Sequence, residues 1–155
     1  SAPSARVITV SSMLHKKGTI DPTSFKTTER YNAQTAYAQS KLANVLFAFA
    51  LARRLEGTSV TSNALHPGGV RTDIVRDLPW IVRMLIGLVF ISAERGAETS
   101  IMLASDPAYQ SGTGRYFDQG KEASAAKTAM DVEAQETLWR ESLALLALEE
   151  PALQH

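Results

Sequence analysis

A tyrosine and a lysine four residues apart, Tyr37 and Lys41, are the residues of this sequence best suited to acid–base chemistry. Positions i and i+4 share one face of an α-helix, so the phenol and the ammonium group would point the same way. A nearby positive charge stabilises phenolate and lowers a tyrosine pKa from about 10, which makes tyrosine a usable general acid or base near neutral pH. Taken alone the pattern is common, since on the order of one chain in four of this length contains it by chance. A surface tyrosine beside a solvated lysine is the plainer interpretation of the pattern alone.

Two other short motifs fall where a ligand site would lie. Ser11-Ser12 ends a β-branched, apolar stretch from Arg6 to Val10, and His66-Pro67-Gly68-Gly69 follows a second such stretch, 60–65. In open α/β sheets, ligands bind beyond the carboxyl ends of the strands, where a serine hydroxyl can reach a substrate oxygen and glycines let the backbone approach closely. Each motif also has a plain explanation, as an ordinary strand end or an ordinary turn, but the order of the motifs along one predicted sheet is consistent.

The elements that would position these residues alternate between strand and helix. The pattern predicts strands over 6–10, 60–65 and 112–118, and helices over 34–56, within 78–91, from an N-cap at Ser92 to 104, and over 126–148; a loop with at most one helical turn spans 16–35. Strands that alternate with helices favour a parallel sheet with crossover helices, and hence an α/β fold.

Composition excludes several classes of protein. The 155 residues are 45% hydrophobic and 21% charged, which is typical of a globular chain, and we expect one domain over 1–149 with a disordered tail over 150–155. Sixteen basic residues balance 16 acidic ones with no basic stripe, so no nucleic-acid partner is expected. The lack of cysteine excludes a disulfide scaffold, a thiolate nucleophile and a cysteine-ligated metal, and the three histidines suggest no metal site.

Taken together, the motifs resemble the short-chain dehydrogenase/reductase family. The resemblance rests on Val10-Ser11-Ser12, Tyr37-x-x-x-Lys41 and the turn over 66–72, and it extends from about Arg6 to Asp118. The stretches 36–44 and 51–55 look closer still to the retinol dehydrogenase branch, whose insertion after the serine suits the long gap between Ser12 and Tyr37.

The resemblance implies a role for each motif residue. Tyr37 would donate a proton to the carbonyl in reduction or accept one in oxidation, while Lys41 would lower the tyrosine pKa and bind the nicotinamide ribose. Ser12 would hydrogen-bond the substrate oxygen and stabilise developing negative charge. The implied cofactor-binding residues are Tyr37, Lys41, Pro67, Gly68, Val70 and Thr72.

The family's Gly-x-x-x-Gly-x-Gly turn is absent from these 155 residues. The resemblance therefore implies the C-terminal portion of a Rossmann-like doubly wound parallel sheet, with three strands and flanking helices. It also implies an NAD(P)(H) cofactor, with NADP expected over NAD, although the residue that selects between them is not in this chain. We expect the chain alone to be inactive and to bind cofactor weakly or not at all. We also expect it to be poorly stable, because the strand at Val7 would keep an exposed apolar edge.

The apolar stretch 78–90 occupies the place of the family's substrate-binding lid. Trp80, Met84 and Leu85 are the expected lid residues, and such a lid would suit a retinol-like lipophilic alcohol or aldehyde, or a ketone. The same stretch could contact a membrane surface, pack on the core or form a dimer contact. With no signal peptide and no transmembrane span in the chain, we expect a cytoplasmic or peripherally membrane-associated protein.

Two other interpretations remain open. A truncated product of the same fold could serve as a non-catalytic binding or homodimerisation module, since an enzyme needs the nucleotide-binding half and a module does not. An unrelated α/β protein with chance matches is the weaker alternative, because three motifs would have to coincide in order.

Overall fold

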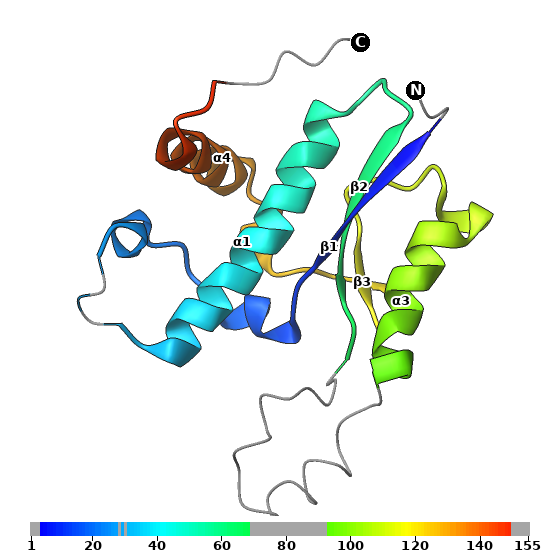
Figure 1. Cartoon of the computed structure of the whole chain (residues 1–155), viewed down its shortest axis with the longest axis horizontal. Coiled ribbons are helices and arrows are strands. Elements are labelled where there is room, and N and C mark those ends of the chain that lie inside the picture. The colour runs from blue at the N-terminus through cyan, green and yellow to red at the C-terminus, as the bar shows by residue number, and fades with distance from the viewer. Residues whose placement is uncertain (1–3, 28, 30, 69–92, 150–155) are drawn as a thin grey trace, which may run out of the picture.

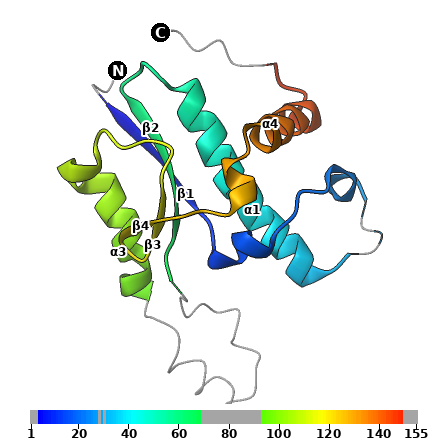
Figure 2. The ribbon, with the colours of Figure 1, turned by 180° about the vertical axis from the view of Figure 1, so that it is seen from behind.

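The computed structural model describes residues 4–27, 29, 31–68 and 93–149, which form a four-stranded sheet covered by helices on both faces. The strands are β1 (Ala5–Val10), β2 (Val60–His66), β3 (Tyr116–Asp118) and β4 (Lys121–Ala123). Figure 1 shows α1 (Ala33–Arg54) on one side of this sheet and α3 (Ala93–Ser105) on the other, and Figure 2 shows the same arrangement from behind. The α/β class predicted from the sequence is confirmed.

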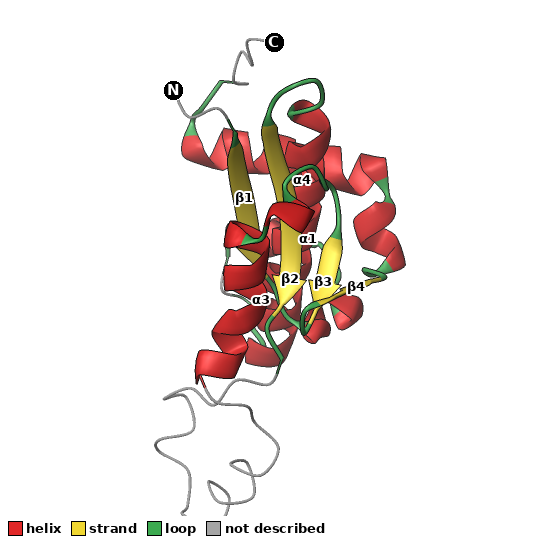
Figure 3. Ribbon diagram, turned by 90° about the vertical axis from the view of Figure 1, so that its right-hand side faces the viewer, coloured by secondary structure: helices red, strands yellow, loops and turns green. Residues whose placement is uncertain are grey.

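The strands lie side by side in chain order, β1-β2-β3-β4 (Figure 3). β1 pairs in parallel with β2 over Ala5–Val10, and β2 pairs in parallel with β3, so the carboxyl ends of all three strands lie at one edge of the sheet. Among the described residues β1 has β2 as its only neighbour, and Val10 is 46% exposed. The apolar edge expected at Val7 therefore has no partner strand in the described part of the chain.

The fourth strand was not expected from the sequence. β3 turns through Gln119 and Gly120 into the antiparallel β4, and both turn residues have positive φ, 47° and 82°. Two-residue hairpins need this left-handed backbone, which Asn-Gly or Asp-Gly usually signals. Gln119 occupies the first turn position, so the usual sequence signal is missing.

The long helix α1 forms because its apolar residues recur every three or four positions. Asn32 caps its N-terminus, with Oδ1 accepting from the backbone N–H of Gln34 and Thr35 at 3.0 Å each. Its buried face packs on β1, β2 and β3 and consists of Ala38, Leu42, Val45, Leu46, Ala48, Phe49, Ala50 and Ala52. This face forms the larger of two hydrophobic clusters, and the smaller one joins Leu65, Leu103 and Phe117 under α3.

The last helix, α4 (Val132–Leu146), packs against α1. Glu136 pairs with Arg53 and Arg54, the latter at 2.7 Å, and these guanidinium groups lower the pKa of the Glu136 carboxyl. The ring of Trp139 stacks on Phe47 at 5.7 Å and carries the Arg54 guanidinium 4.1 Å from its centroid.

The bounds of two predicted elements were wrong. The strand over 112–118 is confined to Tyr116–Asp118, because the preceding loop is held partly by a side chain: Asn63 donates to the carbonyl of Gly112 at 2.7 Å and accepts from the N–H of Arg115 at 2.9 Å. The helix over 126–148 begins only at Val132, where Asp131 caps it, and a 3-10 turn, η5 (Lys127–Met130), precedes it. The loop before α1 contains two 3-10 turns, η1 (Met13–Lys17) and η2 (Pro22–Phe25).

Candidate active site

The N-terminal half of α1 is fixed to the carboxyl end of β1 by two side chains. Ser11 is buried, and its hydroxyl donates to the carbonyl of Lys41 at 2.7 Å. Asn44 donates from Nδ2 to the carbonyl of Val10 at 2.9 Å. These two bonds join the strand end to the turn of α1 that carries Lys41, so the helix cannot slide along the sheet without breaking both.

The predicted pair, Tyr37 and Lys41, comes together on one face of α1. The ammonium nitrogen of Lys41 lies 5.3 Å from the centroid of the Tyr37 ring, a distance at which the cation is attracted to the ring. Tyr37 is 44% exposed, whereas Lys41 is half-buried. The phenol is thus accessible to a ligand, while the charge beside it is partly shielded from solvent.

Ser12 begins the η1 turn directly beyond β1. Its backbone is extended, and its hydroxyl accepts from the N–H of Leu14 at 3.3 Å as the N-cap of the turn. A hydroxyl that accepts one hydrogen bond keeps its own proton to donate. Ser12 can therefore donate to a substrate oxygen without giving up its contact in the turn.

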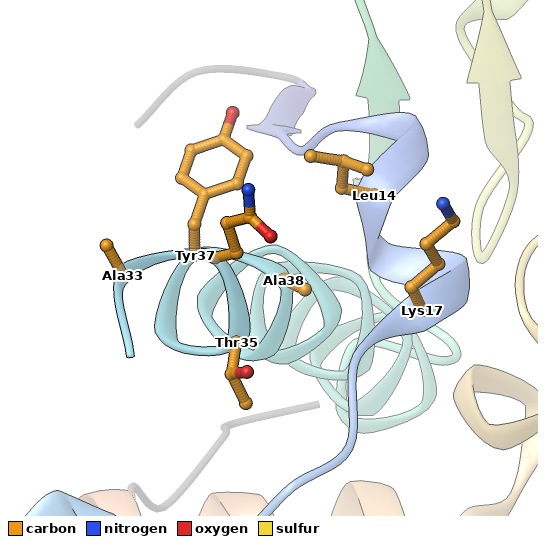
Figure 4. A pocket seen from close by; sticks show the side chains of 7 residues that line it. Leu14, Lys17, Ala33, Thr35, Tyr37 and Ala38 are labelled. Atoms are coloured by element: carbon orange, nitrogen blue, oxygen red, sulfur yellow. The ribbon is translucent and has the colours of Figure 1, made fainter. Parts of the chain in front are cut away.

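A pocket of about 570 Å³ opens between η1 and the start of α1, lined by Leu14, Lys17, Ala33, Gln34, Thr35, Tyr37 and Ala38. Figure 4 shows the Tyr37 ring rising from α1 on one side, with Leu14 and Lys17 projecting from η1 on the other. Leu14 lies two residues beyond Ser12, so the turn that begins at Ser12 supplies one wall of the pocket beside Tyr37.

The glycine-rich turn after β2 lies at the same edge of the sheet. Gly68 is buried and has a φ of 94°, a left-handed conformation that a residue with a Cβ rarely adopts. Pro67 is half-buried beside it. Val70, Thr72 and the expected lid residues Trp80, Met84 and Leu85 lie outside the described residues, as do Ser92 and the predicted helix within 78–91.

Three polar residues, His66, Tyr116 and Asp118, lie on the face of β2 and β3 that α1 covers, and the first two are buried. His66 and Asp118 are register partners, and Tyr116 lies two residues before Asp118 on the same face. Burial lowers the pKa of His66, and burial together with Asp118 raises the pKa of Tyr116 to about 12. Tyr116 is 2% exposed and closed to a ligand, whereas Tyr37 is 44% exposed and lines the pocket.

The described residues contain neither a metal-binding cluster nor a membrane-spanning helix. No cluster of three or more His, Cys, Asp or Glu side chains is arranged to hold a metal ion there. None of the helices in these parts of the chain is both long enough and apolar enough to cross a membrane.

Gly18 allows the η1 turn to approach α1 closely. A Cβ at this position would lie 2.5 Å from the carbonyl oxygen of Ala38 and 3.0 Å from the Cβ of Leu42. The Ala38 carbonyl is part of the helix backbone and cannot move aside as a flexible side chain can, so only glycine permits this contact. Ala38 directly follows Tyr37, so the contact lies beside the site.

We therefore expect Gly18→Ala to destabilise the protein by about 1–3 kcal/mol, because the added methyl group overpacks the contact. Urea unfolding measures the loss, and Thr19→Ala, at the exposed next position, is the matched control. Stabilisation of the Gly18 variant, as expected if alanine only restricted the unfolded chain, would contradict the close contact.

Two residues that help to build this site were not predicted from the sequence. Asn44 is not among the site residues predicted from the sequence, and neither is His15, although it is fully buried and contacts Ala126 across 111 positions. Contacts between residues far apart in the chain leave no local pattern in the sequence. The one available sign was the amide side chain of Asn44, which lies on the same helix as Tyr37.

A family model described as short chain dehydrogenase matches residues 2–79, which include β1, α1 and β2 with the Ser12, Tyr37 and Lys41 positions. The chain belongs to this short-chain dehydrogenase family. The match confirms the family expected from the sequence motifs.

The similar curated relatives within the family agree with the expected branch. The chain is 45% identical over 154 residues to human Retinol dehydrogenase 14, and 42% identical over 147 residues to mouse Polyprenol dehydrogenase. These alignments cover 96% and 91% of the chain but only 46% and 44% of the two relatives. This short-chain dehydrogenase chain thus spans less than half the length of the curated relatives it matches.

Solved structures support the same fold. An uncharacterised protein of Mycobacterium paratuberculosis superposes with a TM-score of 0.74 at 30% identity, covering 96% of the chain and 53% of that structure. A mutant of a Serratia marcescens short-chain dehydrogenase/reductase gives a TM-score of 0.52 at 26% identity over 74% of the chain and 44% of that structure.

Proposed function

We propose that the gene product that contains this chain is an NAD(P)(H)-dependent oxidoreductase that interconverts an alcohol and a carbonyl compound. The observation that carries the proposal is the exposed Tyr37 phenol beside the Lys41 ammonium, which opens onto a pocket whose opposite wall is formed by Leu14 and Lys17 of the turn that Ser12 caps. Family membership and the retinol and polyprenol dehydrogenase relatives favour the same reaction class.

The residues of the chain divide the proton chemistry between them. In reduction, Tyr37 Oη donates a proton to the carbonyl oxygen, and the Lys41 ammonium stabilises the phenolate that remains. Ser12 Oγ donates a hydrogen bond to the same oxygen as negative charge develops on it. In oxidation, Tyr37 takes the proton from the alcohol.

The turn at Gly68 fits the nicotinamide end of the cofactor. A buried glycine at φ 94° brings bare backbone to the edge of the sheet, where a flat ring can lie against it. When bound, the cofactor supplies or accepts the hydride. Pro67, Gly68, Val70 and Thr72 are the proposed contacts of this end, together with Tyr37 and Lys41, and NADP is preferred to NAD.

A lipophilic alcohol or aldehyde is the proposed substrate class. Three of the pocket residues, Leu14, Ala33 and Ala38, are apolar, and the apolar stretch 78–90 with Trp80, Met84 and Leu85 would add to this surface. In this proposal the same stretch makes peripheral contact with a membrane, and the gene product forms a homodimer. The 155 residues alone are proposed to be inactive, because the sequence contains no Gly-x-x-x-Gly-x-Gly turn.

The proposal is tested by following NADPH and NADH oxidation at 340 nm with retinal, a medium-chain aldehyde and a short-chain aldehyde. We expect turnover with NADPH, and a higher kcat/KM for the two more lipophilic aldehydes. Binding of a protein partner by a gene product that turns over no carbonyl substrate would instead favour the non-catalytic module.

Ser12→Ala is expected to lower kcat by about 100- to 1,000-fold with little change in KM, because the hydroxyl acts on charge that develops in the transition state. Steady-state kinetics with NADPH and the preferred aldehyde give both constants. Ser105→Ala, at an exposed serine near the far end of α3, is the control and should leave both constants unchanged. Equal kinetics for the Ser12 variant and the wild type would remove Ser12 from the reaction.

A further inference from the structure

His15 is a fully buried histidine in the turn that begins at Ser12. Its Nδ1 lies 2.7 Å from the carbonyl oxygen of Ser12, and its Nε2 lies 3.0 Å from the backbone nitrogen of Ala126. A carbonyl can only accept and an N–H can only donate, so Nδ1 carries the proton and Nε2 is bare. A neutral imidazole of defined tautomer therefore bridges the Ser12 turn and the segment that leads to α4.

The Ser12 carbonyl accepts a second hydrogen bond at the same time. The backbone N–H of His15 donates to it at 3.0 Å, and the N–H of Leu14 donates to the Ser12 hydroxyl at 3.3 Å. The peptide group after Ser12 is thus held by both the main chain and the side chain of His15. The Tyr116 ring packs against the imidazole, with 4.7 Å between the two ring centroids and 47° between the ring planes.

We propose that His15 is a positioning residue for Ser12, which aims the Ser12 hydroxyl at the substrate oxygen by holding the Ser12 carbonyl. The inference rests on the proposed oxidoreductase function, because it needs a reaction in which Ser12 takes part. Ser11 is anchored to α1 and β2, with its hydroxyl on the carbonyl of Lys41 and its N–H on the carbonyl of Leu65, but Ser12 begins a short 3-10 turn, a weakly held structure by itself. A displacement of about 1 Å at a reacting group can lower a rate by about 100-fold.

Burial, more than any neighbouring charge, keeps the imidazole in its neutral, bridging form. Burial is the main cause that lowers the His15 pKa, with Lys16 of η1 and His66 of β2 acting in the same direction. The bond to Ser12 and Asp118 of β3 oppose this effect. Protonation would place a hydrogen on Nε2 facing the N–H of Ala126, so the bridge is complete above the ordinary histidine pKa of about 6.5 and is lost as the pH falls toward the lowered value.

Two substitutions separate the two contacts of the imidazole. Asparagine places an amide N–H near the position of Nδ1 and can keep the bond to the Ser12 carbonyl. Glutamine reaches the position of Nε2 with its amide oxygen and can keep the bond to Ala126. Both variants lose one hydrogen bond from the same buried site, so a purely structural role predicts similar losses of stability and of activity for the two.

The test compares kcat, KM and thermal midpoint of the gene product with His15→Asn and His15→Gln, using NADPH and the preferred aldehyde. We expect similar midpoints for the two variants, kcat within about threefold of wild type for asparagine and about tenfold or more lower for glutamine, and unchanged KM for both. Wild-type kcat should also fall as the pH drops through the lowered pKa of His15, below the ordinary histidine value of about 6.5, with a shallower fall for asparagine, which cannot be protonated.

A double substitution decides whether the effect passes through Ser12. In the Ser12→Ala background, His15→Gln should cause less than a twofold further loss of kcat, because residues that act as one unit are not additive. The inference is overturned if His15→Gln lowers kcat equally in both backgrounds. It is also overturned if the wild type is active and the glutamine variant keeps its kcat; the proposed function survives either result. A wild type that reduces no aldehyde overturns the proposed function, and the inference with it.

Discussion

Replacing Tyr37 with phenylalanine should lower kcat/KM for carbonyl reduction by about 100- to 10,000-fold, the usual contribution of a positioned general acid. The change removes one exposed hydroxyl and keeps the ring that Lys41 faces, so the fold should be unaffected. Steady-state assays with NADPH and a lipophilic aldehyde measure the loss, and circular dichroism checks the fold.

Tyr31→Phe is the matched control for this experiment. Tyr31 is 70% exposed and lines a second hollow, formed by η2 and the start of α1, which Tyr37 does not line. Its variant should keep wild-type activity. If Tyr37→Phe retained more than a tenth of the wild-type kcat/KM, another group would have to deliver the proton.

Truncation of Leu46 is expected to cause the largest loss of stability, about 2–5 kcal/mol for Leu46→Ala. Leu46 has no exposed surface, and it lies in the cluster that joins α1 to β2, β3 and α4. Removing its branched end leaves a cavity between the helix and the sheet, because neighbours that are themselves packed on several elements can collapse only in part.

Urea unfolding gives this free energy, provided that the m-value does not change. Leu145→Ala is the control, since this leucine on α4 is 49% exposed and its loss should change stability by about 0.5 kcal/mol or less. A loss below about 1 kcal/mol for Leu46→Ala would mean that α1 does not hold the sheet as described.

The two effects link the core to the chemistry. Tyr37 and Leu46 lie on the same helix, nine residues apart, and the buried face that includes Leu46 sets the position of α1 on the sheet. Ser11 and Asn44 then set its position along β1, so that Tyr37 meets the pocket beside the Ser12 turn. A substitution in the core can therefore lower activity by moving Tyr37, although the substituted residue does not contact the substrate.

Much of the local architecture followed from the sequence because its signals are local. The apolar spacing of α1 and the β-branched run of β1 each lie within one element, and the helix predicted over 34–56 is found at Ala33–Arg54. Hairpin β4 was missed because its signal depends on a turn residue, Gln119, that rarely adopts positive φ. The start of β3 was missed because Asn63, from another strand, holds the preceding loop.

The family, the α/β class and the candidate acid–base pair could all be predicted from the sequence, since a four-residue spacing on a helix sets which side chains share a face. The groups that surround that pair could not, because they come from other elements of the fold. The hydrogen bonds from Ser11 and Asn44, the close contact at Gly18 and the His15 bridge to Ala126 all join residues far apart in the chain. Such contacts depend on how helices and strands pack, and packing is set by the whole core and not by any one segment.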